Sequence, residues 1–290
     1  MSLLVSIITP SFNQVNFIEE TILSVKDQDY PEIEHIVIDG GSTDGTIEIL
    51  KKYPHLTWIS ELDEGQVEAI NKGFKMAKGE VITWLNSDDT YLQDTLSVVG
   101  GYFATHPDVD MVFGDCRQVD QDGKIIGRIK GHSFNLTHLI PRNCIPQPAV
   151  FFKRKILERV GYLNPKWQHA FDYDYWLRIG LAGYRIDYLP KTLANFRLHR
   201  NSKTCKEMDV QRREEGEIAK SYARCIGKMC SVIVKDLKDL KEEKVNRVLI
   251  YGIGRAGKML YSVLAENDFE VLGFMDSDEK REGDRFLDKR

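Results

Sequence analysis

The chain has 290 residues, which is enough for one large domain or two ordinary domains. Its 42% of hydrophobic and 29% of charged residues are typical of a soluble globular protein. The net charge of −4 provides no basic field that would attract nucleic acid, and the five cysteines lack metal-ligand spacing, as is typical of reduced thiols. The longest apolar runs are far shorter than the ~20 residues of a membrane-spanning helix. We therefore expect a cytoplasmic protein with no transmembrane segment and no nucleic-acid partner.

Two adjacent carboxylates, Asp88 and Asp89, follow an apolar run that predicts a buried strand, Glu80–Leu85. In open α/β sheets, ligands bind outside the carboxyl ends of the strands. Mg²⁺ takes one or two carboxylates in such places and completes its shell with substrate phosphates. The pattern therefore favours a metal–diphosphate site. The alternative is an Asp-rich turn, since Asp and Ser are ordinary turn residues.

Strand and helix signals alternate over the first part of the chain, which predicts an α/β fold with a mostly parallel sheet flanked by helices. The expected strands Val5–Thr9, His35–Ile38 and Thr57–Ser60 each run into a polar cluster. Two glycines after the second strand, Gly40 and Gly41, allow the backbone to approach a ligand closely. A free helix N-terminus at such a turn suits an anion or a ribose. Several polar clusters at one edge of a sheet indicate a binding site.

Four segments, in this order, resemble the family 2 glycosyltransferases, which have the GT-A fold. They are Val5–Asn13, Ile36–Thr46, Ser60–Gly73 and Ile82–Asp89, and the resemblance extends over roughly the first two hundred residues. It implies a divalent ion, Mg²⁺ or Mn²⁺, held by Asp89 with the help of Asp88 and His199. It also implies these substrate-binding residues: Thr9, Pro10, Phe12, Asn13, Asp39, Gly41, Ser42, Asp63, Gln66, Asn71, Lys72, Asn86, Asp88, Gln147, Arg197 and His199.

The resemblance also assigns tasks within this set. It implies that the Thr9–Asn13 loop and the region of Asp39 cradle the nucleoside of a sugar nucleotide. It places Asp63, Asn71 and Lys72 in a segment beside the base and the diphosphate.

Two positions depart from the family pattern. The family often has two acids where this chain has Asp39 followed by Gly40, so one nucleoside contact is expected to be missing. The metal motif of the family usually opens with Asp, and here that position is Asn86. An Asn side chain can accept a hydrogen bond or coordinate through its carbonyl, but it brings no charge. We expect a lowered metal affinity, with the ligand geometry around Asp89 retained.

A second chemical focus is the segment Phe171–Arg178, where a helix is predicted to begin near Asp172. Acids at the start of a helix suit its positive end, and this structural explanation fits Asp174. The resemblance aligns Asp172 with the general base of the family. Phe171 stands where the family has a further acid, and this apolar neighbour would desolvate Asp172 and raise its pKa.

Two more segments belong to the resemblance. In the first, Gln147 would reach a hydroxyl of the acceptor sugar, and the alternative is a Pro-bounded edge strand. The second is an R-x-H element formed by Arg197 and His199, whose histidine would contact the metal or the diphosphate. The alternative there is an ordinary surface or core histidine. Between these segments and the metal segment, Asp120 and a following Asp-Gly pair predict a hairpin turn.

Residues 206–244 are highly charged, with apolar residues at helical spacing, and predict a helical connector or a lid. After them, the strand Arg247–Tyr251 leads into a G-x-G-x-x-G motif, and a second strand is expected at Glu270–Met275. This part, residues 245–290, predicts an incomplete Rossmann-like βαβ unit, too small for a full dinucleotide site. The GT-A domain is accordingly expected at residues 1–205.

The favoured function is that of an inverting, metal-dependent glycosyltransferase of the hexosyltransferase type, acting in cell-surface polysaccharide or glycan biosynthesis. Its donor would be a nucleoside-diphosphate sugar, with a UDP-sugar favoured by family habit. Its acceptor would be a glycan or a lipid-linked glycan, and work at the cytoplasmic membrane face and oligomer formation stay open. One alternative is an NAD(P)- or nucleotide-binding oxidoreductase or sensor centred on the C-terminal glycine motif. Another is a catalytically silent sugar-nucleotide-binding module, suggested by Asn86 and Phe171.

Overall fold

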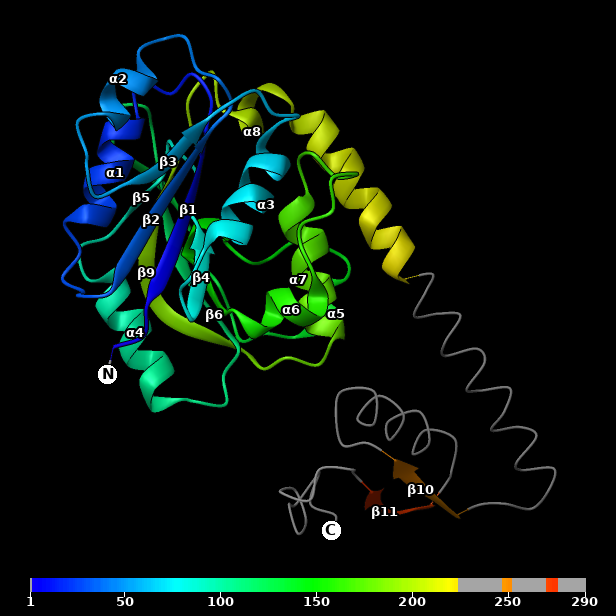
Figure 1. Cartoon of the computed structure of the whole chain (residues 1–290). Helices are drawn as coiled ribbons and strands as arrows, with labels where there is room; N and C mark the ends of the chain where they lie inside the picture. The colour runs from blue at the N-terminus through cyan, green and yellow to red at the C-terminus, as the bar shows by residue number, and fades with distance from the viewer. Residues whose placement is uncertain (1, 224–246, 252–269, 276–290) are drawn as a thin grey trace. The chain divides into compact units, whose positions relative to one another are not determined.

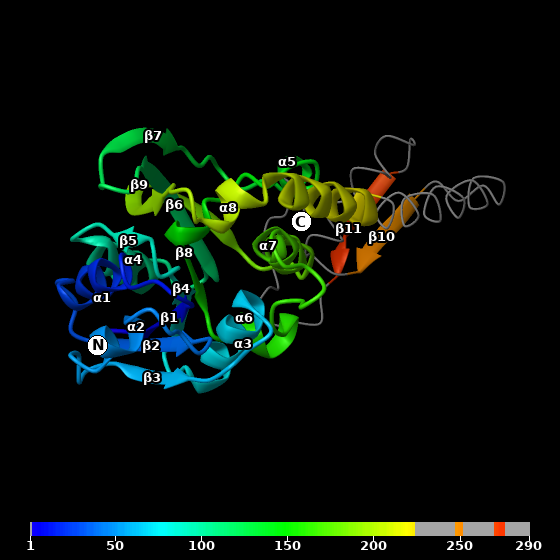
Figure 2. The ribbon, with the colours of Figure 1, turned by 90° about the horizontal axis from the view of Figure 1, so that it is seen from above.

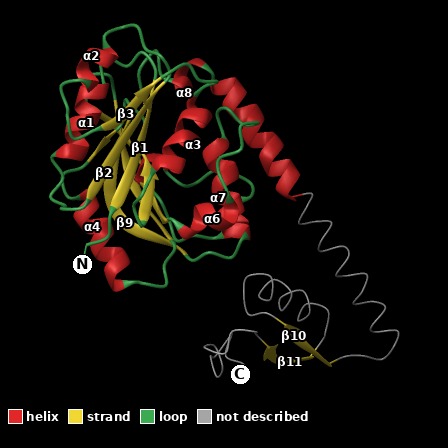
Figure 3. Cartoon of the chain, viewed as in Figure 1, coloured by secondary structure: helices red, strands yellow, loops and turns green. Residues whose placement is uncertain are grey.

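Alternating strands and helices build an open sheet with helices on both faces (Figures 1 and 3). The computed structural model describes residues 2–223, 247–251 and 270–275. The chain divides into two compact units, residues 1–218 and 219–290. The elements of the first unit, in chain order, are β1 (Val5–Ser11), α1 (Ile18–Lys26), β2 (Ile33–Asp39), α2 (Thr46–Leu50), β3 (Thr57–Ser60), α3 (Gln66–Met76), β4 (Val81–Trp84), β5 (Thr90–Tyr91), α4 (Thr95–Thr105), β6 (Met111–Val119), β7 (Ile125–Ile129), α5 (Leu136–Leu139), the 3₁₀ turn η1 (Gln147–Ala149), β8 (Val150–Lys153), α6 (Lys155–Val160), α7 (Phe171–Leu181), β9 (Ile186–Arg197) and α8 (Lys203–Lys206).

The first four strands make the parallel half of the sheet, in the order β3-β2-β1-β4. In this half, Ser11, Asp39 and Ser60 lie beside one another at the ends of β1, β2 and β3. The backbone N–H of Leu85 donates to Ile8 O at 2.9 Å, which continues the pairing of β4 with β1 up to the metal segment. The polar clusters that follow these strands therefore meet at one edge of the sheet, as the alternating pattern predicts.

The second half of the sheet mixes strand directions. Strand β8 inserts between β4 and β6 and is antiparallel to both, whereas β6 and β9 are parallel. The short strands β5 and β7 pair antiparallel with β9 and β6. The α/β fold is confirmed, and the predicted mostly parallel sheet is more fully described as a mixed sheet whose first half is parallel. The hairpin between β6 and β7 is also confirmed, because Asp120 Oδ1 accepts the N–H groups of Asp122 and Lys124.

Helices α1 and α4 cover one face of the sheet, and α3, α6 and α7 cover the other (Figure 2). Helix α3 lies so close to β1 that a Cβ on Gly73 would come within 2.3 Å of the Ile8 side chain, so this position needs glycine. On the same face, the rings of Trp84 and Trp176 stack with centroids 5.3 Å apart. This aromatic packing fixes α7 against the end of β4, which leads into the metal segment.

A further helical stretch covers residues 208–223. In the second unit, β10 (Arg247–Tyr251) and β11 (Glu270–Met275) form a parallel pair at the two predicted strand positions. The glycine motif between them and most of the predicted connector lie outside the described residues. The boundaries predicted at residues 205 and 244 stay predictions. In the part of the chain that the structure describes, no helix has the length and apolar character needed to cross a bilayer.

Candidate active site at the strand ends

The carboxylate of Asp39 organises the turn that follows β2. It is fully buried and accepts hydrogen bonds from the N–H groups of Gly41 (3.0 Å) and Ser42 (2.8 Å). It also accepts the hydroxyls of Ser42 (2.6 Å) and Ser60 (2.8 Å). Gly41 has a φ of 83°, a conformation that favours glycine. Asp39, predicted to contact the nucleoside, is thus occupied in shaping the loop that would surround a nucleoside.

The loop after β1 is joined to this turn. The backbone N–H of Asn13 donates to Ser42 Oγ at 2.7 Å, and Asn13 Oδ1 accepts the N–H of Thr43 at 2.9 Å. Phe12 beside it is 59% exposed and presents an aromatic face at the strand ends. Pro10 and Thr9 are buried within β1, and Thr9 Oγ1 bonds His35 Nε2 at 2.9 Å. Of the predicted nucleoside-binding residues in this loop, Phe12 and Asn13 are therefore accessible, whereas Thr9 and Pro10 support the strand.

Asp63 lies over the turn after β2, beside Gly40. A Cβ on Gly40 would come within 3.1 Å of the Asp63 carboxylate oxygens. The same carboxylate accepts the N–H of Gly65 at 2.9 Å. Burial raises the pKa of Asp63, and the nearby charge of Asp39 adds to the rise. The Asp63 carboxylate, from the β3–α3 loop, thus lies beside Gly40, the position where the family resemblance leads one to expect a second acid.

Two residues of α3 have structural tasks that differ from the predicted donor contacts. The Asn71 side chain donates to Leu163 O at 2.9 Å and accepts Leu163 N–H at 3.0 Å, so it pins the loop that precedes α7. Lys72 forms ion pairs with Glu61 (3.0 Å) and Glu68 (3.1 Å). The side-chain amide of Asn71 is engaged by backbone, and the Lys72 ammonium by two carboxylates. Their contacts with the base and the diphosphate stay predictions.

Asn86 forms the centre of a chain of amide side chains. Its Oδ1 accepts Gln66 Nε2 at 2.7 Å, and its Nδ2 donates to both Asp89 Oδ2 and Gln147 Oε1 at 3.1 Å. Gln147 in turn donates to Trp84 O at 2.9 Å. A carboxylate at position 86 could not donate to Asp89 and would repel it. Asn86 is therefore matched to its neighbours, and it links the predicted acceptor residue Gln147 to the metal segment.

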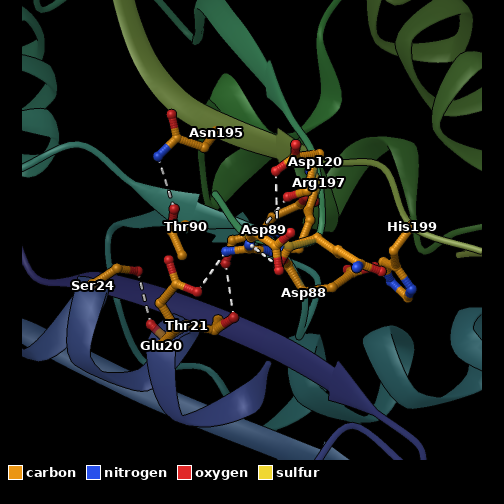
Figure 4. A network of polar contacts seen from close by, with 12 residues as sticks. Glu20, Thr21, Ser24, Asp88, Asp89, Thr90, Asp120, Asn195, Arg197 and His199 are labelled. Atoms are coloured by element: carbon orange, nitrogen blue, oxygen red, sulfur yellow. Dashed lines mark hydrogen bonds and ion pairs between the residues drawn. The ribbon is translucent and has the colours of Figure 1, made fainter. Parts of the chain in front are cut away.

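Asp89 is turned into the protein (Figure 4). It is 1% exposed, and its Oδ1 accepts the backbone N–H of Arg197 at 2.9 Å while its Oδ2 accepts Asn86. Its own carbonyl accepts the hydroxyl of Thr21 at 2.8 Å. Burial, together with the charge of Asp88, raises the pKa of Asp89 well above its usual range. Both carboxylate oxygens of Asp89 hold protein N–H groups in this structure, and its role as the main metal ligand stays a prediction.

The buried side chain of Arg197 joins several segments in the same network (Figure 4). The side chain of Arg197 is 2% exposed. Its guanidinium donates to Asp88 O at 2.9 Å and to Glu20 Oε2 at 2.6 Å. It also reaches the hairpin carbonyls of Asp120 (3.3 Å) and Gln121 (3.1 Å). The donors of Arg197 hold the backbone of the metal segment, and its contact with the substrate stays a prediction.

Asp88, which is partly exposed, and His199, which is buried, form the next pair of the network. Their Oδ2 and Nε2 atoms are 3.0 Å apart, and the imidazole packs on Phe17 with ring centroids 4.4 Å apart. Neighbouring ligands in an octahedral shell with bonds of about 2.1 Å lie roughly 3 Å apart, so this pair fits a divalent ion. The backbone N–H of Asn201 donates to His199 Nδ1 at 3.3 Å, which leaves Nε2 as the ring nitrogen that faces Asp88. Within the described ranges, no group of three or more His, Cys, Asp or Glu side chains is placed to hold a metal.

Asp172 lies in the first turn of α7, the helix that packs against Trp84 at the end of β4. Its carboxylate accepts Asn143 Nδ2 at 3.1 Å and the N–H of Tyr173 at 2.7 Å. Burial raises its pKa to about 6, against the lowering effect of these two hydrogen bonds. The preceding Phe171 packs against Trp84 with ring centroids 6.3 Å apart. The predicted base is therefore a carboxylate with a raised pKa, held beside the end of β4.

Glu214 helps to hold the segment that precedes Asp172, and the sequence analysis did not predict this. Its carboxylate accepts three backbone N–H groups, those of Gln168 (3.0 Å), His169 (2.8 Å) and Ala170 (2.9 Å), immediately before α7. Lys203 adds a hydrogen bond to Gln168 O. Residues from beyond β9 thus fasten the segment that leads into Asp172.

The sequence held only a weak signal for this contact. Glu214 stands one helical turn before the buried Ile218, so it is a charged residue on the apolar face of the predicted helix. Nothing in the local pattern says which backbone groups it meets. Glu207, which pairs with His169 Nε2 at 2.9 Å, carries no such signal.

Comparison with known proteins identifies the family. Residues 6–162 match the family model for glycosyl transferase family 2. A relative from Bacillus subtilis, the putative teichuronic acid biosynthesis glycosyltransferase TuaG, is 31% identical over 208 residues, which cover 69% of this chain and 81% of that protein. A glycosyltransferase of PGL/p-HBAD biosynthesis from Mycobacterium tuberculosis is 28% identical over 179 residues, covering 60% of this chain and 68% of that one.

Solved structures share the fold. Residues 1–349 of TarS from S. aureus, in complex with UDP-GlcNAc, superpose with a TM-score of 0.60 at 23% identity, covering 70% of this chain and 61% of that one. The mannosyltransferase PcManGT from Pyrobaculum calidifontis, in complex with GDP-Man and Mn²⁺, gives 0.59 at 24% identity, covering 77% and 64%. The chain thus spans less than two thirds of either solved chain. With its mixed sheet, flanking helices and polar strand ends, the chain is a GT-A glycosyltransferase that belongs to family 2.

Proposed function

We propose that this glycosyltransferase is inverting and metal-dependent, and that it moves a sugar from a UDP-sugar to a hydroxyl of a glycan acceptor. The UDP-GlcNAc complex of TarS supports a uridine donor, and the Mn²⁺ complex of PcManGT supports a divalent ion. The relationship to TuaG supports a task in cell-surface polysaccharide biosynthesis. The cytoplasmic location stays a prediction of the sequence.

The donor would lie along the edge formed by β1, β2 and β4. Phe12, the Asn13 loop and the turn held by Asp39 would surround the nucleoside, and Asp63 would add a carboxylate beside it. The diphosphate would then extend toward Asp88 and His199, which would hold Mg²⁺ or Mn²⁺. The ion would offset the negative charge that develops on the departing diphosphate.

Asp172 would act as the general base. A carboxylate with a pKa of about 6 is mostly ionised at neutral pH, yet it is a stronger base than an ordinary Asp. The hydrogen bond from Asn143 orients it, so that it can take the proton of an acceptor hydroxyl as that oxygen attacks the anomeric carbon. Attack from the side opposite the diphosphate inverts the anomeric configuration.

The observation that carries this proposal is the partly buried Asp172, with its raised pKa, at the start of the helix that packs against Trp84 of β4, and Asp172→Asn tests it. The measurement is the release of UDP from UDP-glucose, UDP-galactose and UDP-GlcNAc in the presence of Mn²⁺, with the first-formed anomer identified by NMR. We expect the variant to lose about 10²–10⁴ in rate while still binding UDP. The exposed Asp94→Asn is the matched control. Full activity of Asp172→Asn, or a product with retained configuration, would refute the mechanism.

A further inference from the structure

A long basic stretch borders the proposed base. Residues 123–157 contain no Asp or Glu, although the whole chain has a net charge of −4. Within this stretch, Lys130 and Arg142 belong to the segment 130–143, which we name the basic loop; both are exposed. They have no carboxylate within ion-pair distance among the residues that the structure describes, and the same holds for Lys124 on the adjoining hairpin. These charges are available to a ligand.

Hydrogen bonds hold the basic loop to β6 at its beginning and to the start of α7 at its centre and its end. Its beginning is held by the N–H of Gly131, which donates to Asp115 Oδ1 at 2.9 Å. Its centre is held by Ile140 O, which accepts the hydroxyl of Tyr173. Its end is held by Asn143, whose side chain donates to Asp172 at 3.1 Å. Arg142 is therefore one residue away from a group that contacts the base.

The hairpin strand next to the loop adds to the positive charge. Arg117 on β6 and Arg128 on β7 stand directly opposite each other, so their side chains emerge on the same face. Like charges in such a pair are destabilising unless an anion lies between them. Asp115 pairs with Arg128 at 3.1 Å, and no ion pair of Arg117 occurs among the described residues. One carboxylate for two guanidinium groups leaves an excess of positive charge.

We propose that the basic loop and the β6–β7 face bind an anionic acceptor, a glycan chain that carries phosphate or carboxylate groups, and hold its hydroxyl beside Asp172. This inference rests on the proposed role of Asp172 as the base of glycosyl transfer. An anionic lipid surface is the competing ligand, since Ile125 and Ile126 are also exposed on β7. The attachment of the loop to Asp172 favours the acceptor, because a membrane-docking surface needs no contact with a base.

The test measures binding of fluorescently labelled short oligomers to the full chain by anisotropy, at about 50 mM salt and again at high salt. The probes are poly(glycerol phosphate), oligogalacturonate and a neutral malto-oligosaccharide. We expect the anionic oligomers to bind at least about tenfold more tightly than the neutral one, and Lys130→Gln/Arg142→Gln to lose about tenfold of that affinity. High salt should weaken the same interaction. The matched control, Lys51→Gln/Lys78→Gln, removes two exposed lysines elsewhere and should bind as the parent chain does.

Two outcomes would overturn the inference. One is equal affinity for neutral and anionic oligomers, or no difference between the two double variants. The other is binding to phosphatidylglycerol vesicles without binding to either anionic oligomer, which would assign the loop to a membrane. A titration of UDP with Mn²⁺ on the same variants should show unchanged donor binding. If UDP fails to bind the parent chain, the proposed transferase function fails, and this result is distinct from a failure of the oligomer measurement.

Discussion

At the scale of single residues, Asp89 and Asp172 show how surroundings give two carboxylates different tasks. Both oxygens of Asp89 accept protein N–H groups, one from the backbone of Arg197 and one from Asn86. Asp172 is held through Asn143 and the N–H of Tyr173 and lies at the start of a helix, next to the loop that we assign to the acceptor. Asp89 is thus suited to holding the metal segment in shape, and Asp172 to exchanging a proton.

The first prediction concerns the pH dependence of the reaction. A base must be ionised to accept a proton, so kcat/KM for the donor should rise with pH through about 6 and level off above it. The hydrogen bond from Asn143 favours the ionised form and lowers the pKa of Asp172. Asn143→Ala should therefore move the rising limb to higher pH, measured as kcat/KM over a pH series.

Asn164→Ala, in the loop before α7, is the control and should leave the limb unchanged. If the pH at which kcat/KM rises is the same in Asn143→Ala as in the parent chain, the assignment of the base is contradicted. The stability of the fold gives a separate check. The pKa of Asp172 is higher in the folded protein than in the unfolded chain. The contribution of Asp172 to the free energy of unfolding is therefore full below the unfolded pKa and is lost as the pH rises through about 6. Asp172→Asn should accordingly be at least as stable as the parent chain at pH 8, as measured by Tm.

At the scale of elements, the N-terminus of α7 is stabilised from outside its own sequence. A helix N-terminus has unpaired N–H groups and a partial positive charge. Glu214 accepts three N–H groups immediately before this helix, and Lys203 bonds to the same segment. The position of Asp172 therefore depends on a carboxylate from a later helix.

The second prediction is that Glu214→Gln weakens this support while leaving donor binding intact. Gln keeps the shape and one acceptor but loses the charge, so we expect a stability loss of about 1–2 kcal/mol. Displacement of Asp172 should lower kcat about tenfold with an unchanged KM for the donor. Steady-state kinetics and thermal unfolding measure the two effects. Glu217→Gln, an exposed residue of the same helix, should show neither, and an equal loss in both variants would remove the special role of Glu214.

At the scale of the whole molecule, the sequence predicts the parts that local patterns encode. Alternating strands and helices predict the α/β fold, and the polar residues after Ser11, Asp39 and Trp84 mark the edge where the strand ends meet. The position of Asp172 at the start of a helix is also visible in the local pattern. These features depend on neighbouring residues, so a single sequence is enough to find them.

Long-range partners could not be predicted in the same way. Arg197 and Asp88 are 109 residues apart, and only the fold shows that the guanidinium is buried on that segment rather than free for a diphosphate. Asn71, Lys72 and Asp89 likewise have partners that the local pattern does not bring together, and their contacts with donor and metal stay predictions. The insertion of β8 between β4 and β6 likewise has no local signal. A charge or an amide in a motif indicates chemistry, but its partner decides whether it meets substrate or protein.

The most direct test of the central claim is isothermal titration of UDP, GDP and dTDP into the full chain, with and without Mn²⁺. We predict that UDP binds in the presence of Mn²⁺, and that omitting the ion or changing Asp88→Asn weakens binding at least about tenfold. Asp122→Asn, a turn carboxylate, is the control and should bind as the parent chain does. A UDP affinity that changes neither when Mn²⁺ is omitted nor in Asp88→Asn would contradict the metal site. Binding of NAD(P) and of none of the three nucleotides would contradict the transferase function itself.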